Sequence, residues 1–323
     1  MVEIGETKLG LESITNKNLT WIDIQKPTRE KMKILQDSHL FHELNIEDCL
    51  SKIQIPKIDR HEDYIFVLLH FPSIEKNESI PRSTQLAIFV GFDYLVTVRQ
   101  GELRSLTEMF QFCKLNEKQR DSFMGKSSGY LLHSIIDFLV DDLLHILMKL
   151  KGNLDDIEDV VFDEKVSAPK EIALLRREIT TLRRIVIPLK RTVLDLSKDL
   201  QKFSEEDLTL YFDDVKDHID KVIEVLEESK ETIEIFKDTD FMLSTEKSNK
   251  ILAILTILFT LSIPVTVVAA IYGMNVNLPG GIETGSPTFF GQYTSLILLV
   301  VAVTVPAVIM MWYFKRQGWI ELE

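Results

Sequence analysis

Two long apolar runs lie close to the C-terminal end of the sequence. The first covers residues 251–271 and the second residues 294–314, and each has 21 residues without a formal charge. A bilayer core of ~30 Å needs ~20 apolar residues in a helix, so each run is long enough to span a membrane. The alternative is a pair of buried core helices, but such helices rarely run this far without a charge.

Shorter apolar runs occupy the first third of the chain. Residues 64–71, 84–91 and 94–100 are rich in β-branched and aromatic side chains, and prolines, a glycine and an aspartate interrupt them. This pattern predicts strands of a mostly antiparallel sheet. A helical pattern at residues 30–35 indicates that helices accompany the sheet.

From residue 129 onward the pattern becomes that of long charged helices. Apolar residues recur at helical spacing in 131–161 and again in 170–202, which predicts two long helices. Pro188 lies inside the second and predicts a kink there.

A third helix is predicted to begin at Ser204. Ser204 is a suitable N-cap, and the acidic side chains that follow it suit the first turn of a helix. No proline or glycine occurs between Ser204 and Pro264, so one helix is expected to run for roughly 90 Å into the first apolar run. A core helix followed by a separate membrane helix is the alternative. The apolar positions that predict the soluble part of this helix are Val215, Ile219, Val222, Leu226, Ile233, Phe236 and Leu243.

The charge of the chain is unevenly distributed. The net charge is −13, and almost all of it lies in residues 1–250. An acidic surface argues against a nucleic-acid partner and fits a surface that meets cations. Cys49 and Cys113 lack metal-ligand spacing, so we expect free thiols in a reducing compartment. The first ten residues have no apolar signal-peptide core, so we expect residues 1–250 to stay on the side where they are made.

Basic residues predict how the two spans are oriented. Lys247 and Lys250 precede the first span, Lys315 and Arg316 follow the second, and residues 272–292 contain no Lys or Arg. The positive-inside rule then predicts two cytoplasmic termini and an external loop. The spans carry no Asp, Glu, Lys, Arg or His for a proton relay, and there is no second copy of the pair to form an inverted repeat. Because two helices cannot enclose an aqueous path, a conducting protein would be a ring of identical subunits in the lipid bilayer.

The end of the first span carries a recognisable motif. The sequence Tyr272-Gly273-Met274-Asn275 resembles the GMN signature of the CorA family of magnesium channels. Residues 138–143 and 211–218 also look like segments of this family. Further residues that match the family pattern around the first span are Asn249, Leu255, Thr256, Pro264, Thr266, Ile271 and Tyr272.

This resemblance implies a fold class and a function. The expected fold is an α+β cytoplasmic domain with long α-helices that lead into two C-terminal transmembrane helices, assembled as a funnel-shaped homo-oligomer of five subunits. The implied function is Mg2+ influx across the plasma (inner) membrane, gated by intracellular Mg2+. The expected parts are a cytoplasmic α/β domain (1–125), a helical stalk (126–249), a first transmembrane helix (250–271), an external loop (272–293), a second transmembrane helix (294–314) and a basic cytoplasmic tail (315–323).

The family motif implies a selectivity filter formed by Gly273, Met274 and Asn275. Mg2+ releases its water reluctantly, so a ring of neutral oxygens that hydrogen-bond the hydrated ion suits rapid passage better than a carboxylate cage. Asn275 would supply an amide oxygen, and Gly273 would leave room for backbone carbonyls. The alternative is that this glycine and asparagine only cap the helix.

Six residues of the first span are expected on the pore face. Thr256 and Thr266 could hydrogen-bond the water around the ion, whereas Leu252 and Ile263 could form apolar constrictions. A threonine in a span also commonly bonds a carbonyl of its own helix, so both roles stay open for each threonine. The six residues are Asn249, Leu252, Thr256, Ile263, Thr266 and Ala270.

The external loop departs from the family pattern. Many relatives have an acidic element after the motif, whereas residues 276–292 contain Glu283 as their only charge. We expect external attraction of cations to be weaker or to depend on Glu283.

A regulatory cation site is implied in the cytoplasmic part. Asp214 matches the long-helix aspartate that lines a divalent site in some family members, and Glu75 is the acid nearest to the expected partner position. The acidic stretch 155–163 could also collect ions, although a solvated helix face explains it better.

Other functions remain as alternatives. Related branches of the family transport Co2+, Ni2+ or Zn2+, in some cases with proton coupling, but softer metals favour His or Cys ligands and the expected pore face has neither. A non-conducting membrane sensor would have no use for the GMN motif. An enzyme is not expected, because no P-loop, HExxH or GxSxG motif occurs and the seven histidines form no recognisable metal-site motif.

Overall fold

The structure is a computed structural model, and it describes residues 4–6, 11–51, 54–74, 80–162, 168–274 and 293–318. The chain divides into two compact units, Met1–Asp240 and Phe241–Glu323. The described strands are β1 (Ile4–Glu6), β2 (Glu12–Asn16), β3 (Leu19–Gln25), β4 (Lys57–Arg60), β5 (Ile65–Ser73), β6 (Arg82–Val90) and β7 (Tyr94–Arg99). The described helices are α1 (Arg29–His39), α2 (Glu43–Leu50), α3 (Arg104–Leu115), α4 (Glu117–Met124), α5 (Ser128–Val161), α6 (Pro169–Asp199), a 3-10 turn (Leu200–Phe203), α7 (Thr209–Tyr272) and α8 (Thr294–Arg316).

The first unit contains a seven-stranded sheet in the order β1-β2-β3-β7-β6-β5-β4. Neighbouring strands are antiparallel except β3 and β7, which run parallel from Thr20 opposite Tyr94 to Gln25 opposite Arg99. The expected strands at 64–71, 84–91 and 94–100 are confirmed as β5, β6 and β7. The sequence pattern did not single out β1 to β4.

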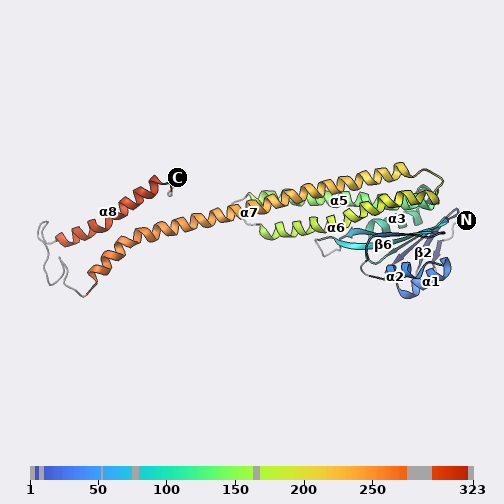
Figure 1. Cartoon of the computed structure of the whole chain (residues 1–323), viewed down its shortest axis with the longest axis horizontal. Coiled ribbons are helices and arrows are strands. Elements are labelled where there is room, and N and C mark those ends of the chain that lie inside the picture. Colours follow the sequence, from blue (N-terminus) through green and yellow to red (C-terminus); the bar gives the residue numbers. More distant parts are fainter. Residues whose placement is uncertain are drawn as a thin grey trace. The chain divides into compact units, whose positions relative to one another are not determined.

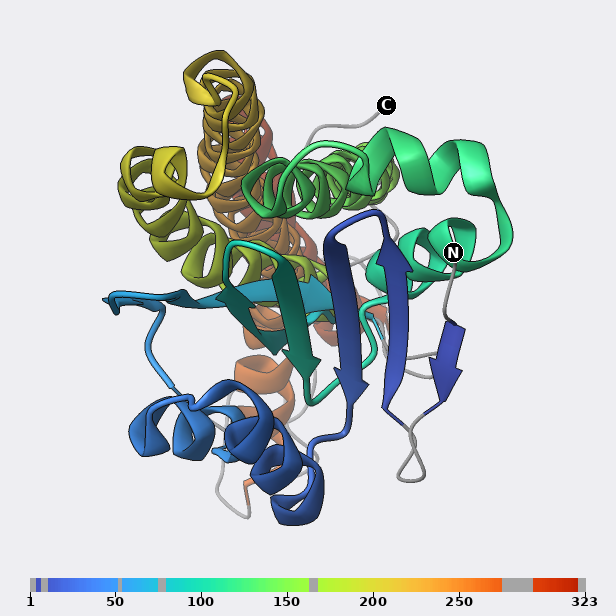
Figure 2. The ribbon, with the colours of Figure 1, turned by 90° about the vertical axis from the view of Figure 1, so that its right-hand side faces the viewer.

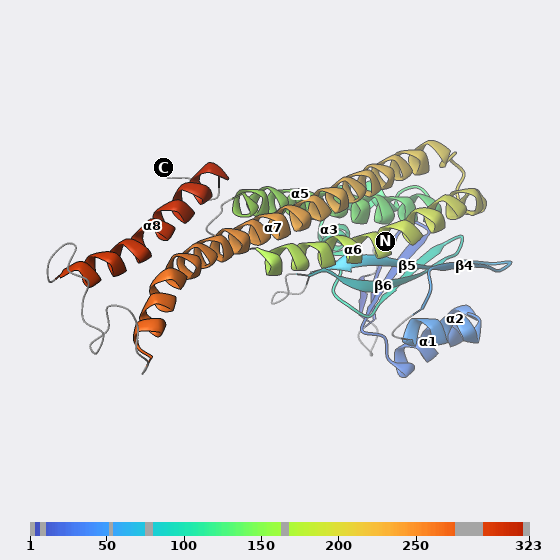
Figure 3. The same cartoon turned by 60° about the vertical axis from the view of Figure 1, so that its left-hand side comes forward.

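Both faces of the sheet are buried. Alternate residues of β5 belong to different hydrophobic clusters: Val67 and Leu69 pack with α3 to α7, whereas Phe66 and Leu68 pack with α1 and α2. Figures 2 and 3 show the sheet between the two short helices α1 and α2 and the longer helices on its other face. Because both faces are covered, the strands read as continuous apolar runs rather than as alternating ones.

Three long helices dominate the rest of the first unit (Figure 1). The patterns at 131–161 and 170–202 are confirmed as α5 and α6, and α6 continues through Pro188. Residues of α6 and α7 form ion pairs at steps of seven along both helices, so the two helices are antiparallel neighbours. The pairs are Arg176–Glu234, Arg183–Glu227 and Lys190–Asp220.

The helix α7 is a single helix of 64 residues, as the lack of proline and glycine before Pro264 predicts. Its start differs from the prediction. Ser204 follows the 3-10 turn in an extended conformation, and its hydroxyl accepts from the Glu206 N–H. The Thr209 N–H, at the first residue of the helix, donates to Asp207 Oδ1 at 2.9 Å. Hydrogen bonds from the Thr209 side chain and from its backbone N–H hold the pKa of Asp207 below its usual value.

The second unit contains residues 241–272 of α7 and the whole of α8. Both helices are long and apolar enough to cross a membrane. None of the residues in the most apolar stretch of either helix is buried within the part of the chain that the structure describes. A surface of this kind needs an apolar environment or other subunits to cover it.

Candidate functional site

The residues expected on the pore face share one side of α7. A helix turns about 100° per residue, so the six positions fall within an arc of about 100° around the helix axis. They are residues 249, 252, 256, 263, 266 and 270. All six side chains are exposed in the single chain, including the apolar Leu252 and Ile263. A side of α7 that carries both apolar and polar groups without a charge is therefore available to a neighbouring subunit or to a water-filled path.

The threonines on this side use their hydroxyl protons within the helix. Thr256 Oγ1 donates to the Leu252 carbonyl at 2.7 Å, and Thr266 Oγ1 donates to the Ser262 carbonyl at 2.9 Å. Each hydroxyl oxygen keeps acceptor capacity and can accept from a water molecule. Such oxygens suit the hydration shell of a cation, whose waters present their hydrogens outward.

The helix ends at a glycine in a confined position. The Gly273 N–H donates to the Ala269 carbonyl at 2.9 Å, and the Met274 N–H donates to the Ile271 carbonyl at 3.2 Å. A Cβ built on Gly273 would lie 2.9 Å from the Ala269 carbonyl oxygen, closer than real Cβ atoms come. The close approach of the backbone at residue 273 therefore requires glycine. The expected filter residue Asn275 and the loop residue Glu283 lie outside the described residues.

A second cluster of functional groups lies in the first unit, where α5 meets α7. One ligand atom from each of Asp137, Asp214 and His218 lies within 4.8 Å of the other two. Asp214 and His218 are four residues apart and so share a face of α7, while Asp137 comes from α5. The sequence-predicted Asp214 thus lies beside two potential ligands that the sequence analysis did not single out.

The electrostatics of this cluster favour a cation. Burial raises the pKa of Asp137 above its usual value, and the nearby Asp141 and Asp214 raise it further, while His133 and His218 act in the opposite direction. His218 Nδ1 lies 3.5 Å from Asp141 Oδ1 but has no hydrogen-bond partner among the described residues. A bound cation would relieve the mutual repulsion of the carboxylates.

The donor set fits a divalent metal ion. Two carboxylates suit Mg2+, which prefers oxygen ligands and keeps several of its waters. The imidazole of His218 is a donor that suits Zn2+, Co2+ or Ni2+. The cluster therefore has the chemistry of a divalent site without selecting one metal by donor type.

The other predicted residues of the cytoplasmic part are Glu75 and the acidic stretch 155–163. Glu75 lies outside the described residues. In the acidic stretch 155–163, the described acidic side chains are exposed on α5, in agreement with a solvated helix face. The four-residue spacing of Asp214 and His218 is visible in the sequence, but their proximity to Asp137 depends on how α5 packs against α7.

Comparison with known proteins identifies the family. The model of the CorA-like Mg2+ transporter protein family matches residues 16–316. The cobalt/magnesium transport protein CorA of Thermotoga maritima is 27% identical over 304 residues, covering 93% of this chain and 83% of that protein. The zinc transport protein ZntB of Pectobacterium carotovorum is 22% identical over 318 residues, covering 98% and 93% of the two chains.

A solved structure shares the fold. The complete structure of the CorA magnesium transporter from Methanocaldococcus jannaschii aligns with a TM-score of 0.79 and 21% identity, covering 96% of each chain. The α+β unit, the long helices and the two apolar C-terminal helices therefore have the architecture of a known metal transporter. The family match extends over nearly all of the sequence, from β2 to the end of α8. The chain belongs to the CorA-like Mg2+ transporter family, whose members transport divalent metal ions.

Proposed function

We propose that the chain is the subunit of a homopentameric channel through which Mg2+ enters the cytoplasm down its electrochemical gradient. The observation that carries this proposal is the uncharged side of α7, which combines Asn249, Thr256 and Thr266 with apolar residues in a transporter of divalent metals. A path lined by neutral oxygens can pass a hydrated ion without binding it tightly. The absence of Asp, Glu, Lys, Arg and His from residues 251–271 and 294–314 favours a channel over a proton-coupled carrier.

The proposed topology follows the basic residues. Each apolar run has one end flanked by basic residues, and we assign these two ends to the cytoplasm. The basic residues are Lys247, Lys250, Lys315 and Arg316. Residues 250–271 and 294–314 cross the plasma (inner) membrane, and the loop 272–293 is external. Residues 1–125, 126–249 and 315–323 are the cytoplasmic domain, the helical stalk and the basic tail.

The external entrance is assigned to Gly273, Met274 and Asn275. Hydrated Mg2+ donates hydrogen bonds from its water to the Asn275 amide oxygens of the five subunits. Glu283 raises the local concentration of cations at this entrance. The ion then passes the hydroxyl oxygens of Thr266 and Thr256 and the apolar constrictions at Ile263 and Leu252.

Regulation is assigned to the cluster of Asp137, Asp214 and His218. Asp137 of α5 and Asp214 and His218 of α7 would hold a cytoplasmic Mg2+ ion when it is abundant, and holding α5 and α7 together in this way would favour the closed channel. Each subunit offers three ligands, and water or a further carboxylate, for which we propose Glu75, would supply the other oxygen ligands that Mg2+ prefers. Loss of the ion restores repulsion between the carboxylates and favours opening.

Transport of Co2+, Ni2+ or Zn2+ is the second candidate function. His218 in the cluster favours it, because imidazole binds these metals better than Mg2+. The similarity to a zinc transport protein also supports it. A membrane sensor that conducts no ion is the third candidate, and an influx assay separates it from the other two.

The deciding experiment measures Mg2+ influx into proteoliposomes with an internal Mg2+-sensitive dye. Wild type is compared with Asn275→Ala and with Asn277→Ala, which removes the same side chain two residues further along the loop. Influx driven by potential and concentration alone, lost in Asn275→Ala and kept in Asn277→Ala, is the expected result. Uptake of Zn2+ or Co2+ without Mg2+, or a need for a proton gradient, would replace the Mg2+ channel with the second candidate.

A further inference from the structure

A basic groove lies between α6 and α7 in the first unit, away from the cluster at Asp214. Its volume is about 550 Å³, within the usual range for small-ligand sites. Its polar lining includes the side chains of Arg176, Arg177, Thr180, Thr181, Arg184 and Lys237. Every lining residue belongs to the unit Met1–Asp240.

The charge of the groove is opposite to that of the chain. Four of its lining side chains are cationic and one, Asp240, is acidic, whereas the chain as a whole has a net charge of −13. Asp240 Oδ1 accepts a hydrogen bond from the Ala168 N–H at 3.3 Å, at the start of α6. The Asp240 carboxylate is therefore bound to the backbone at the start of α6. The four cationic side chains outnumber it, so the groove has a local excess of positive charge.

Two of the four cations have partners that explain their position. Arg176 Nε lies 2.8 Å from Glu234 Oε1, and Lys237 Nζ lies 2.7 Å from Glu234 Oε2. The guanidinium groups of Arg177 and Arg184 form no ion pair or hydrogen bond with the residues that the structure describes. They are seven residues apart, so both project from the same side of α6.

Packing of the helix pair does not account for Arg177 and Arg184. The contacts that tie α6 to α7 use Arg176, Arg183 and Lys190, which follow a different set of positions. Neighbouring guanidinium groups without acidic partners repel one another, and a bound anion would remove that repulsion. Both side chains are exposed, and their position on one wall of a groove suits an anionic ligand.

The available donors define the ligand further. Thr180 Oγ1 and Thr181 Oγ1 both donate to carbonyls of their own helix at 2.8 Å, so the guanidinium groups and Lys237 supply the donors. The fork of an arginine matches the oxygens of phosphate and can bind two of them at once. We propose that this groove binds a phosphate group.

Two sources could supply the phosphate group. One is the headgroup of an anionic phospholipid, since Asp240 precedes Ile251, the start of the first apolar run, by eleven residues in the same helix. Juxtamembrane basic residues commonly attract such headgroups. The other source is a soluble phosphate compound. The shared chemistry is the phosphate group, and the experiment has one arm for each source.

The test uses full-length protein purified in a neutral detergent. Native mass spectrometry counts bound phosphatidylglycerol, with phosphatidylcholine as the uncharged comparison, and calorimetry measures inorganic pyrophosphate binding in Mg2+-free buffer. The variant is Arg177→Gln/Arg184→Gln. The matched control is Arg29→Gln/Lys33→Gln, which removes two exposed positive charges from α1. Circular dichroism checks that both variants keep the helical content of the wild type.

The expected result is a loss of affinity of at least about tenfold for one or both phosphate probes in the groove variant, with the control unchanged. Loss for phosphatidylglycerol alone identifies a lipid headgroup, and loss for pyrophosphate alone identifies a soluble ligand. The proposal is overturned if the wild type binds neither probe, if the groove variant binds both like the wild type, or if the control loses as much. It is also overturned if the groove variant changes only the oligomeric state, which would assign the arginines to a contact between subunits. None of these readouts requires ion transport.

Discussion

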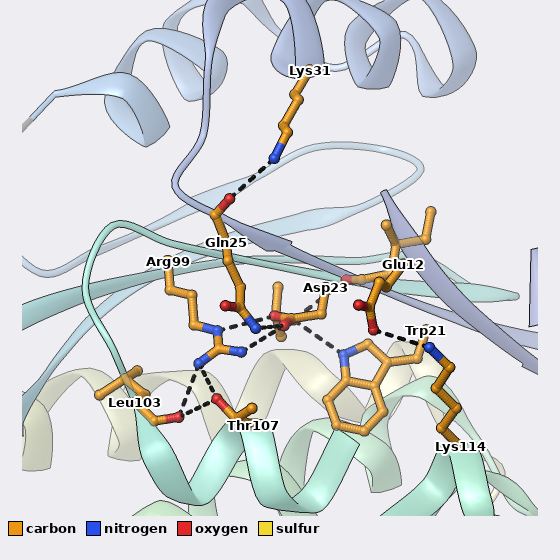
Figure 4. Close-up of polar contacts among 11 residues, drawn as sticks. Glu12, Trp21, Asp23, Gln25, Lys31, Arg99, Leu103, Thr107 and Lys114 are labelled. Atoms are coloured by element: carbon orange, nitrogen blue, oxygen red, sulfur yellow. Dashed lines mark hydrogen bonds and ion pairs between the residues drawn. The ribbon is translucent and has the colours of Figure 1, made fainter. Parts of the chain in front are cut away.

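Arg99 Nη2 lies 2.7 Å from Asp23 Oδ2, and the two side chains are only 1% and 2% exposed. This ion pair joins β7 to β3, the parallel pair of the sheet. Thr97 Oγ1 also donates to Asp23 Oδ1 at 2.8 Å, and Arg99 Nη1 donates to Thr107 Oγ1 on α3 at 2.6 Å (Figure 4). The Asp23 carboxylate and the Arg99 guanidinium are thus both paired and hydrogen-bonded, as buried charges need to be.

Asp23→Ala is therefore expected to destabilise the first unit strongly. The change leaves the Arg99 guanidinium buried without a counter-charge, which costs about 3–5 kcal/mol of unfolding free energy. Denaturant unfolding of the full chain in detergent, followed by circular dichroism, measures it. The control is Glu108→Ala, which breaks the exposed Arg104–Glu108 pair and should leave the unfolding midpoint almost unchanged. Equal midpoints for the two variants would contradict this account.

Gly273→Ala is expected to abolish or severely reduce ion transport. A methyl group at residue 273 meets the Ala269 carbonyl oxygen, so the end of α7 must shift and move the following filter residues. Influx into proteoliposomes measures the effect. Gly152→Ala is the matched control, because a Cβ at Gly152 on α5 meets nothing within 4 Å and should preserve transport. If Gly273→Ala transported like the wild type, the close approach at residue 273 would have no functional role.

Removal of carboxylates from the cluster is expected to weaken inhibition by internal Mg2+. Asp137→Asn and Asp214→Asn each delete one of the two anionic ligands, so channels should stay open at higher internal Mg2+. Influx measured against internal Mg2+ gives the inhibition midpoint. Asp213→Asn removes the same charge from the neighbouring exposed residue and should leave this midpoint unchanged. A shift of equal size in the Asp213 variant would mean that general surface charge, not the cluster, sets the response.

Both cysteines are expected to resist thiol reagents in the folded protein. Cys49 and Cys113 are free and buried, as the sequence led us to expect for unpaired thiols. Burial raises the pKa of Cys113 to about 12 and that of Cys49 further still. Thiolates are the reactive form, so a disulfide-exchange reagent at pH 8 should label neither thiol before unfolding and both after it. Rapid labelling of the native chain would contradict the buried positions.

Local patterns made much of this fold predictable. The strands β5 to β7, the helices α5 and α6 and the continuity of α7 all depend on the spacing of apolar residues within one segment. The start of α7 was predicted wrongly at Ser204. Several adjacent polar side chains could accept hydrogen bonds from the first N–H groups of this helix. Asp207 accepts from the Thr209 N–H because of the turn that precedes Thr209, which the local pattern does not predict.

Contacts between distant segments could not be predicted in the same way. The partnership of Asp23 with Arg99 requires the parallel alignment of β3 with β7, which the sequence does not encode locally. The proximity of Asp137 to Asp214 likewise depends on the register between two helices. The sequence named one member of that cluster by family resemblance, and only the packing of α5 against α7 identified the others.

The ion pairs between α6 and α7 limit how the two helices can move. Their residue numbers step by seven on both helices, so sliding one helix by a single turn separates all three pairs at once. Sliding by seven residues, about 10 Å, would bring Arg176 to Glu227 and Arg183 to Asp220 and would re-form two pairs. A slide of three residues in the same direction, about one turn, would instead bring Arg176 to Glu231, Arg183 to Glu224 and Lys190 to Asp217. Slides of one or two residues in this direction place no acidic residue opposite any of the three cations, so within the first unit these ion pairs oppose such displacements smaller than one turn, whereas a step of a whole turn exchanges one set of acidic partners for another.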